Sequence, residues 1–254
     1  MLRSLITAFS LYSRLPVPDI KWDEKNLKYV LWCFPLVGLV HGLILWGLAF
    51  VFSRLAMPPI LFGVIMCAAS ILINGGIHMD GFLDTIDALN SFADKKRRLE
   101  ILKDPHIGAF GVIYAAVYLL VSAGVWSALG SNIFPEGIII FTISRTLSGV
   151  GLVMIPPAKE EGSGAALVRQ CDKRNTRTAL IIMFILQAAT VCLCAPVSGI
   201  IIVSISLFVF WHYVYTAVKY FGGVTGDIAG YFLQLCELAC LCAIAGITLA
   251  VKLR

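Results

Sequence analysis

Charged residues are scarce in this chain. Of its 254 residues only 14% are charged, 59% are apolar, and the mean hydropathy is +0.89. A soluble domain carries about 25% charged residues. The composition therefore excludes an ordinary globular protein, a disordered chain and a nucleic-acid-binding protein with basic faces. It indicates an integral membrane protein.

The sequence also lacks the cysteine spacings of metal and redox motifs. Eight cysteines are present, with no CxxC and no Cys/His pattern of the zinc type. Only Cys171 lies in a charged segment, so we interpret the cysteines as small apolar residues packed within helices. No internal repeat is visible. We expect a single transmembrane catalytic domain over residues 1–254, of the all-α class.

Long uncharged stretches mark the membrane-spanning helices, each of which needs about 20 apolar residues. The stretch 178–218 is too long for one helix, and Pro196 divides it. Residues 1–13 are too short to cross and predict an interfacial or re-entrant segment. Seven spans are therefore predicted in a helical bundle. They are 29–53, 55–79, 107–135, 137–158, two helices within 178–218, and 228–251.

Basic residues are distributed unequally between the two ends of these spans. With the N-terminus inside and the spans alternating, 16 of the 20 Lys and Arg fall in inside segments and 3 in outside segments. This is a positive-inside bias. We expect a multi-pass protein of the prokaryotic cytoplasmic (inner) membrane. Its N-terminus and its longest loops, 80–106 and 159–177, are expected in the cytoplasm, together with any chemistry.

The densest acidic cluster lies in the segment GGIHMDGFLDTIDAL at 75–89. On a helix, Asp80, Asp84 and Asp87 fall at i, i+4 and i+7 and share one face. Like charges at this spacing repel, and an all-oxygen set suits Mg²⁺ held together with substrate phosphates. The alternative is a solvated acidic face on an interfacial helix. Acids are rare elsewhere in the spans, which favours the metal site.

Two further positions each leave two interpretations open. In the segment LKDPHIGAFG, Asp104 either binds a ligand or caps a helix that begins at Pro105, and Lys103 is placed to meet an anion. Arg145 is a lone cation within a span. It either pairs with one of the aspartates or meets a substrate phosphate, because arginine suits both.

The segment GGVTGD at 222–227 opens the last span. Its glycines allow the backbone to approach a ligand closely, and Asp227 is placed to cap the helix or to bind a metal. Alone, the segment is typical of a turn and a helix cap. Together with the acidic helix at the same face, we interpret it as the second wall of one pocket. Glu237, about three turns on, is a buried acid that needs a partner.

Taken together, these segments resemble the cobalamin synthase family. The segments run in order along nearly the whole chain: SRLPVP (13–18), FPLVG (34–38), GGIHMDGFLDTIDAL, LEILKDPHIGAFG (99–111), SR (144–145), EEGSG (160–164) and GGVTGD. The chain departs from the resembled pattern at His106, Lys159 and Gln234. The resemblance implies a membrane transferase of cobalamin biosynthesis with Mg²⁺ as its cofactor.

The reaction implied is the assembly of the nucleotide loop of cobalamin. The adenosylcobinamide-phosphate group of adenosylcobinamide-GDP passes to the 5′-hydroxyl of α-ribazole, or to α-ribazole 5′-phosphate, and GMP is released. These substrates and the lipid bilayer are the expected partners, with no nucleic acid. We also expect a homo-oligomer and association with other enzymes of the pathway.

The site residues that follow from the resemblance form three sets. The metal is expected on Asp80, Asp84, Asp87 and Asp227. The expected catalytic residues are Asp80, Asp84, Asp87, His78 as the first candidate for the base, with one of the aspartates as the alternative, and Arg145 on the phosphate charge. The residues expected to bind substrate are Arg14, Lys103, Asp104, Glu161, Gly222, Gly223, Thr225 and Gly226. On an ideal helix His78 points away from the acidic face, so it has to precede the helix in order to act.

Two rival classes of membrane protein share parts of this chemistry. A CDP-alcohol phosphotransferase would carry the motif D-G-x-x-A-R, whereas this chain has Asp84 and Thr85 at those places. A transporter would use the acids as an ion-coupling site near the midplane of broken helices. The acids here cluster at one face and no inverted repeat is visible, which disfavours a transporter.

Overall fold

The described part of the chain folds as helices, as its apolar composition predicts. The computed structural model describes residues 1–20, 24–55, 57–130, 136–158 and 163–252. Six of the described helices are long and apolar enough to cross a membrane. They are α3 (Val30–Arg54), α7 (Ala109–Leu129), α8 (Glu136–Met154), α10 (Lys173–Cys194), α11 (Pro196–Thr216) with the π-helix η1 (Ala217–Phe221) as its continuation, and α12 (Gly226–Lys252). The expected polytopic all-α architecture is confirmed.

The predicted span 55–79 does not form one straight helix. The chain instead makes α4 (Pro59–Leu72), a short turn, and α5 (Ile77–Asn90), which is bent by 89° from α4. The turn contains Gly75 and Gly76, whose φ angles of +64° and +77° are conformations that glycine adopts without strain. Counting the bent pair as one span gives seven crossings. We treat α5 as a surface helix outside the spanning segments, because it departs from their direction.

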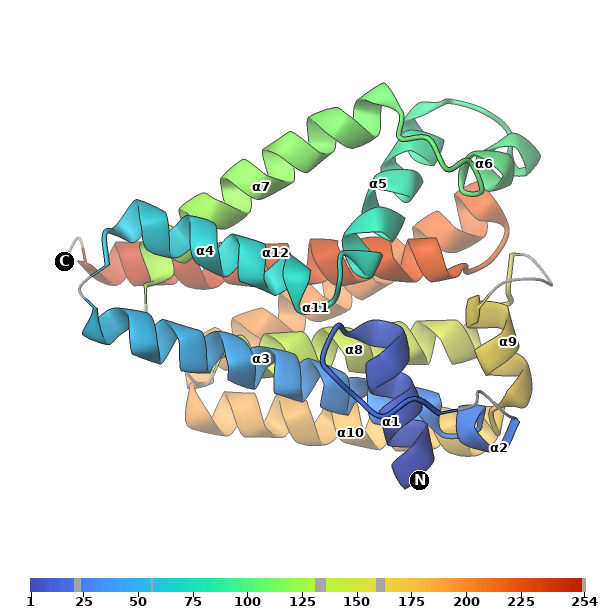
Figure 1. Cartoon of the computed structure of the whole chain (residues 1–254), viewed down its shortest axis with the longest axis horizontal. Helices are drawn as coiled ribbons and strands as arrows, with labels where there is room; N and C mark the ends of the chain where they lie inside the picture. Colours follow the sequence, from blue (N-terminus) through green and yellow to red (C-terminus); the bar gives the residue numbers. More distant parts are fainter. Residues whose placement is uncertain (21–23, 56, 131–135, 159–162, 253–254) are drawn as a thin grey trace.

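The spanning helices lie along the long axis of the molecule, and short helices gather at one end (Figure 1). Figure 1 places α2 (Glu24–Leu27), α6 (Lys95–Ile101) and α9 (Ser163–Gln170) at the end where α12 begins. α12 ends at the opposite end. The segment predicted to be interfacial forms α1 (Leu2–Tyr12), which packs across α3. The helices that carry most of the basic loops therefore share one end of the bundle.

Two helix boundaries follow from single residues. α10 ends at Cys194 and α11 begins at Pro196, as predicted, because proline is well suited to the first turn of a helix. α10 begins earlier than the apolar stretch, at Lys173. Asp172 accepts a hydrogen bond from the Asn175 N–H (3.1 Å) and so caps a first turn that is basic rather than apolar.

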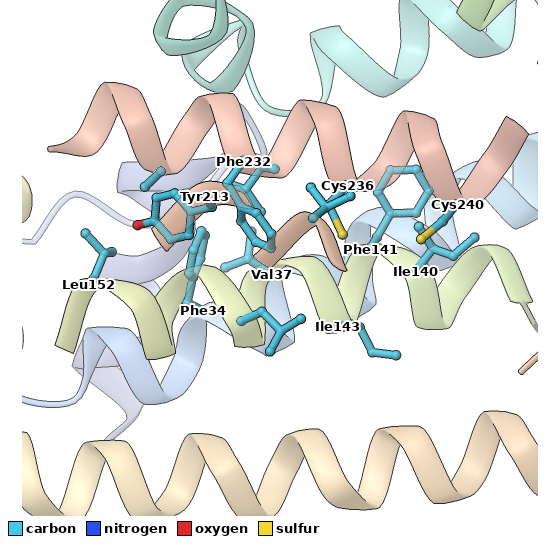
Figure 2. Packing of buried hydrophobic residues seen from close by; sticks show 14 of the residues in the cluster. Phe34, Val37, Ile140, Phe141, Ile143, Leu152, Tyr213, Phe232, Cys236 and Cys240 are labelled. Carbon is cyan, nitrogen blue, oxygen red and sulfur yellow. The ribbon is translucent and has the colours of Figure 1, made fainter. Parts of the chain in front are cut away.

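The hydrophobic core lies between α3, α8, α11 and α12. Figure 2 shows Phe34 of α3, Phe141 of α8, Tyr213 of α11 and Phe232 of α12 directed into it. α8 is the central helix. Of its apolar 18-residue stretch, 83% is buried inside the protein, against 11% for the corresponding stretch of α10. The site described below is therefore built against a helix that is enclosed by its neighbours.

Small residues allow α3 to approach α8 closely. A Cβ atom at Gly38 would lie 2.2 Å from the carbonyl oxygen of Phe141, and one at Gly42 would lie 2.6 Å from the Cα of Ile138. These glycines form a G-x-x-x-G pattern, which is a common device for packing transmembrane helices. Close packing of this pair holds Phe34, four residues before Gly38, near the end of α8 that bears the site.

The lone cation of α8 pairs with the buried acid of α12. Arg145 is fully buried and forms an ion pair with Glu237. Ser144 donates a hydrogen bond to the same carboxylate (2.7 Å), and His41 Nδ1 lies 3.1 Å from the guanidinium. This internal network joins α3, α8 and α12. It replaces the contact of Arg145 with an aspartate or a substrate phosphate that the sequence analysis expects.

We predict that breaking this ion pair on one side unfolds the bundle more easily than removing both charges. Glu237→Leu leaves Arg145 charged and unpaired in the interior, which costs about 3–5 kcal/mol. The double variant Arg145→Met/Glu237→Leu recovers most of that loss. Unfolding of the purified protein in mixed detergent micelles measures both. Equal losses for the single and double variants would contradict this account.

Candidate functional site

The site begins where α5 crosses α12 with backbones almost in contact. A Cβ atom at Gly81 would lie 2.8 Å from the Cα of Asp227, and one at Gly230 would lie 3.0 Å from the carbonyl oxygen of His78. A larger side chain at either glycine would separate the two helices. The crossing therefore brings the GGIHMDG and GGVTGD segments together, as Figure 1 shows for the helices that carry them.

A cavity of about 130 Å³ lies at this crossing. His78 and Asp80 line it from α5, and Gly226 and Asp227 line it from the start of α12. The two segments thus form two walls of one pocket, as predicted. Its remaining lining residues come from α1, α3, α8 and the first turns of α5 and α12: Tyr12, Phe34, Ser148, Leu152, Ile77, Ala229, Gly230 and Leu233.

The acidic residues of α5 differ in their surroundings. Asp80 is exposed at the cavity, whereas Asp84 is half-buried one turn further along. Burial, followed by the charges of Asp80, Asp227 and Asp87, raises the pKa of Asp84 to about 7. The other three carboxylates are therefore close enough to Asp84 to disfavour its charged form, which is the electrostatic condition that a bound cation would relieve.

Asp87 has a structural partner of its own. Its carboxylate accepts hydrogen bonds from the N–H groups of Gly108 (2.9 Å) and Gly111 (2.8 Å), in the first turn of α7. A Cβ atom at either glycine would lie 2.4 Å from a carboxylate oxygen of Asp87. Asp87 thus caps α7 from a neighbouring helix, in the position where an acid is favoured by the unpaired amides and the helix dipole.

The acids suit a divalent cation that is shared with a substrate. Among the described residues, no three His, Cys, Asp or Glu side chains converge in the manner of a complete metal site. Mg²⁺ usually takes only one or two protein carboxylates, and phosphate oxygens and water complete its coordination. Asp80 and Asp227 on facing walls of the cavity, with Asp84 in electrostatic contact with both, are a donor set of that kind.

The loop before α12 is held in place by backbone pairing. Val224 forms an isolated parallel bridge with Pro157, in which the Val224 N–H donates to Pro156 and the Ala158 N–H donates to Val224, each at 2.9 Å. A Cβ atom at Gly223 would lie 2.4 Å from the Pro156 carbonyl oxygen. Gly223 is therefore needed for contact with the protein's own backbone rather than with a ligand.

The other members of this loop have separate roles. Gly222 ends η1 in a left-handed conformation (φ +77°). Thr225 caps α12, because its hydroxyl accepts the Ile228 N–H (3.2 Å) and donates to Asp227 (3.3 Å). Of the four residues of this loop that the sequence analysis expects to bind substrate, only Gly226 lines the cavity.

Three further residues that the sequence analysis expects in the site, Arg14, Lys103 and Asp104, lie outside the cavity. Arg14 is exposed beside the turn that opens α5, and its N–H donates to the Ile73 carbonyl (2.8 Å). Lys103 is exposed in the turn after α6. The Asp104 carboxylate accepts a hydrogen bond from the His106 backbone N–H (3.0 Å) and lies 2.8 Å from the His106 ring. Both contacts lower the pKa of Asp104. Glu161 lies outside the described residues.

The helix cap expected as the alternative role of Asp104 is wrong. The helix of this region begins at Ala109, not at Pro105, and Asp87 supplies the capping carboxylate instead. The reason is tertiary: α5 packs beside α7 and brings a carboxylate from far along the chain to its first turn. Spacing along the sequence does not reveal such a cap.

His78 lies within α5 rather than before it. The helix begins at Ile77, so His78 stands in its first turn, yet it lines the same cavity as Asp80. The sequence analysis expects His78 to reach the site only from a position before the helix, and this expectation is wrong, because His78 lines the cavity from the first turn of α5. The sequence analysis also missed Tyr12, Phe34 and Ser148 on the cavity wall. Phe34 is the first residue of the FPLVG segment and Tyr12 directly precedes SRLPVP, whereas no segment singled out in the sequence contains Ser148.

Comparison with known proteins decides the family. The sequence profile described as cobalamin-5-phosphate synthase matches residues 4–245. The chain belongs to this family. Membership makes it a transferase of cobalamin synthesis and decides against the CDP-alcohol phosphotransferases and the transporters. No solved structure matches the chain.

Several relatives of the chain bear the name adenosylcobinamide-GDP ribazoletransferase. One from Lachnoclostridium phytofermentans is 39% identical over 237 residues, which are 93% of this chain and 91% of the relative. One from Clostridium perfringens strain SM101 is 31% identical over 92% of this chain and 94% of the relative. One from Clostridioides difficile is 30% identical over 94% of this chain and 96% of the relative. The family profile, which spans residues 4–245, includes all the segments that build the cavity.

We predict that Asp87→Ala loosens the start of α7. Loss of the two hydrogen bonds lowers the stability of this turn by about 2 kcal/mol. Hydrogen exchange of the Gly108 and Gly111 amides should accelerate, while amides in the middle of α12 stay protected. Asp87→Asn keeps one oxygen acceptor and should show a smaller effect. Unchanged exchange at α7 in Asp87→Ala would contradict the capping role.

Proposed function

We propose that this chain transfers the adenosylcobinamide-phosphate group of adenosylcobinamide-GDP to a ribosyl hydroxyl of α-ribazole or α-ribazole 5′-phosphate and releases GMP. The observation that carries the proposal is the cavity with Asp80 and Asp227 on facing walls, in a chain of the cobalamin-5-phosphate synthase family. The names of its relatives supply the donor and the transferred group. The acidic walls suit the charge of a diphosphate once a cation is shared between them.

The family description also bears on which hydroxyl reacts. A product that retains a 5-phosphate cannot have been joined through the 5′-oxygen. We therefore replace the 5′-hydroxyl of the sequence analysis with another hydroxyl of the ribose. Its oxygen attacks the phosphorus nearest to cobinamide, the phosphoanhydride bond to GMP breaks, and the hydroxyl proton passes to a base. Such a displacement needs alignment and charge neutralisation more than covalent help from the protein.

Asp80, Asp84 and Asp227 are the residues that would hold Mg²⁺. The bound ion would neutralise charge on the diphosphate in the transition state. We leave Asp87 out of this set, because both of its oxygens accept hydrogen bonds from α7. Asp84 does not line the cavity, but it lies close enough to Asp80 and Asp227 for their charges to raise its pKa, and it would join them around the ion.

The other polar groups of the site divide into two kinds. His78 lines the cavity beside Asp80 and is the proposed acceptor of the hydroxyl proton. Arg14 is exposed at the turn that opens α5 and is the proposed cation for outer phosphate oxygens. Arg145 has no such role in the proposal, because Glu237 holds its guanidinium in the interior.

We place the site at the cytoplasmic face of the inner membrane. The short helices α2, α6 and α9 lie at the same end of the bundle as the start of α12, and the sequence segments around them carry most of the Lys and Arg. A positive end of this kind stays in the cytoplasm. Both substrates of the proposed reaction are charged or polar, and they would reach the cavity from water.

We predict that Asp84→Asn lowers GMP release about a hundredfold or more while the protein still accumulates in the membrane. That factor corresponds to about 3 kcal/mol of transition-state stabilisation. GMP formed from adenosylcobinamide-GDP and α-ribazole by purified protein is the measurement. The matched control is Glu100→Gln, which removes an exposed acid of α6 paired with Arg97, and it should retain wild-type activity. Near-normal turnover by Asp84→Asn would disprove its place in the site.

We predict that removal of divalent cations stops the reaction reversibly. Treatment with EDTA should abolish formation of complete cobamide, and Mg²⁺ in excess should restore it, because the facing carboxylates and the diphosphate repel without a cation. The unfolding temperature should change little, since the helix contacts at the site do not depend on the ion. Full activity in EDTA would refute the metal assignment and leave the helical architecture unaffected.

A further inference from the structure

The floor of the cavity holds a hydroxyl group that has no partner in the protein. Ser148 of α8 is fully buried and lines the cavity, and its Oγ forms no hydrogen bond. Three preceding hydroxyls of the same helix have partners: Thr142 donates to the Ile138 carbonyl (2.8 Å), Ser144 to the Glu237 carboxylate (2.7 Å) and Thr146 to the Thr142 carbonyl (2.9 Å). Ser148 thus differs from these neighbours, because it is a cavity-lining residue whose hydroxyl has no partner.

A second unpartnered group belongs to a residue that lines the same cavity from another helix. His78 of α5 is only 4% exposed, and its Nε2 forms no hydrogen bond. A buried polar atom without a partner is energetically costly, and such atoms are uncommon in native proteins. Two of them around one cavity indicate a polar occupant that hydrogen-bonds to both.

The size and walls of the cavity restrict that occupant. The rings of Tyr12 and Phe34 and the side chains of Leu152 and Leu233 form apolar walls. A volume of about 130 Å³ is close to the roughly 150 Å³ of a cavity that accommodates benzene. A hydroxylated five-membered sugar ring fits this description. A corrin macrocycle is far too large, and no Lys or Arg lines the cavity, so a phosphate group is expected only beside the ion proposed between Asp80 and Asp227.

We propose that Ser148 and His78 hydrogen-bond the ribosyl group of the acceptor nucleoside, so that the cavity is the acceptor subsite of the transferase. This rests on the proposed function, which supplies two ribosyl groups, one in the acceptor and one in the leaving GMP. Attacking and leaving oxygens lie on opposite sides of the phosphorus. Only one of the two groups can therefore occupy the cavity.

The enclosed position favours the acceptor. An acceptor hydroxyl that leaves the cavity between Asp80 and Asp227 reaches the place proposed for the diphosphate. Filling the cavity also keeps water from replacing the acceptor and hydrolysing adenosylcobinamide-GDP. GMP, in contrast, leaves with its phosphate charge and has to reach water. A 5′-phosphate on the acceptor would point out of the cavity, so the same subsite serves both forms of the acceptor.

The experiment compares Ser148→Ala with Ser206→Ala in purified protein. Ser206 of α11 is also buried, but its hydroxyl lies 3.5 Å from Cys240 Sγ and it does not line the cavity. Ser148→Ala should raise KM for α-ribazole about tenfold, the effect of one hydrogen bond, and leave KM for adenosylcobinamide-GDP within about twofold. Ser206→Ala should change neither constant. The unfolding temperature of Ser148→Ala should equal or exceed that of the wild type, because the lost hydroxyl had no partner.

Two kinetic results would overturn the proposal. One is an unchanged KM for α-ribazole in Ser148→Ala. The other is a rise in KM for adenosylcobinamide-GDP alone, which would assign the cavity to guanosine. Titration of α-ribazole without donor separates this proposal from the proposed function. If the wild type releases no GMP, the proposed reaction is wrong. Tenfold weaker α-ribazole binding by Ser148→Ala still supports the subsite, and equal binding by both proteins refutes it.

Discussion

The close crossing of α5 and α12 is the contact on which the site depends. Gly81 lies against the backbone of Asp227, and Gly230 lies against the backbone of His78. Neither helix carries the site alone, because Asp80 comes from one and Asp227 from the other. Van der Waals packing of small residues gives membrane helices their closest approach. Here it also sets the separation of the carboxylates that face the cavity.

Charges within this protein serve two different purposes according to depth. Arg145 and Glu237 are buried between α8 and α12 and neutralise each other, so they contribute to the arrangement of the helices. At the end of the bundle, burial and the nearby charges of Asp80, Asp227 and Asp87 raise the pKa of Asp84. A cation bound among these carboxylates would relieve their mutual repulsion, whereas the interior pair is already neutralised.

Much of the fold follows from the sequence, but the pairing of distant residues does not. Apolar runs and Pro196 predict the spanning helices, because each helix needs a fixed apolar length. Apolar length does not predict the bend at Gly75, since glycine is frequent within transmembrane helices. The acidic face of α5 is visible from its period. Its division into Asp80 at the cavity and Asp87 at α7 depends on which helix packs beside each turn, and so does the pairing of Arg145 with Glu237.

The capping of α7 by Asp87 has a mechanical meaning. Asp80 and Asp87 stand about two turns apart on α5; the first lines the cavity, and the second accepts hydrogen bonds from the amides of Gly108 and Gly111. A displacement of α5 would therefore act directly on the first turn of α7, a helix long enough to cross the membrane.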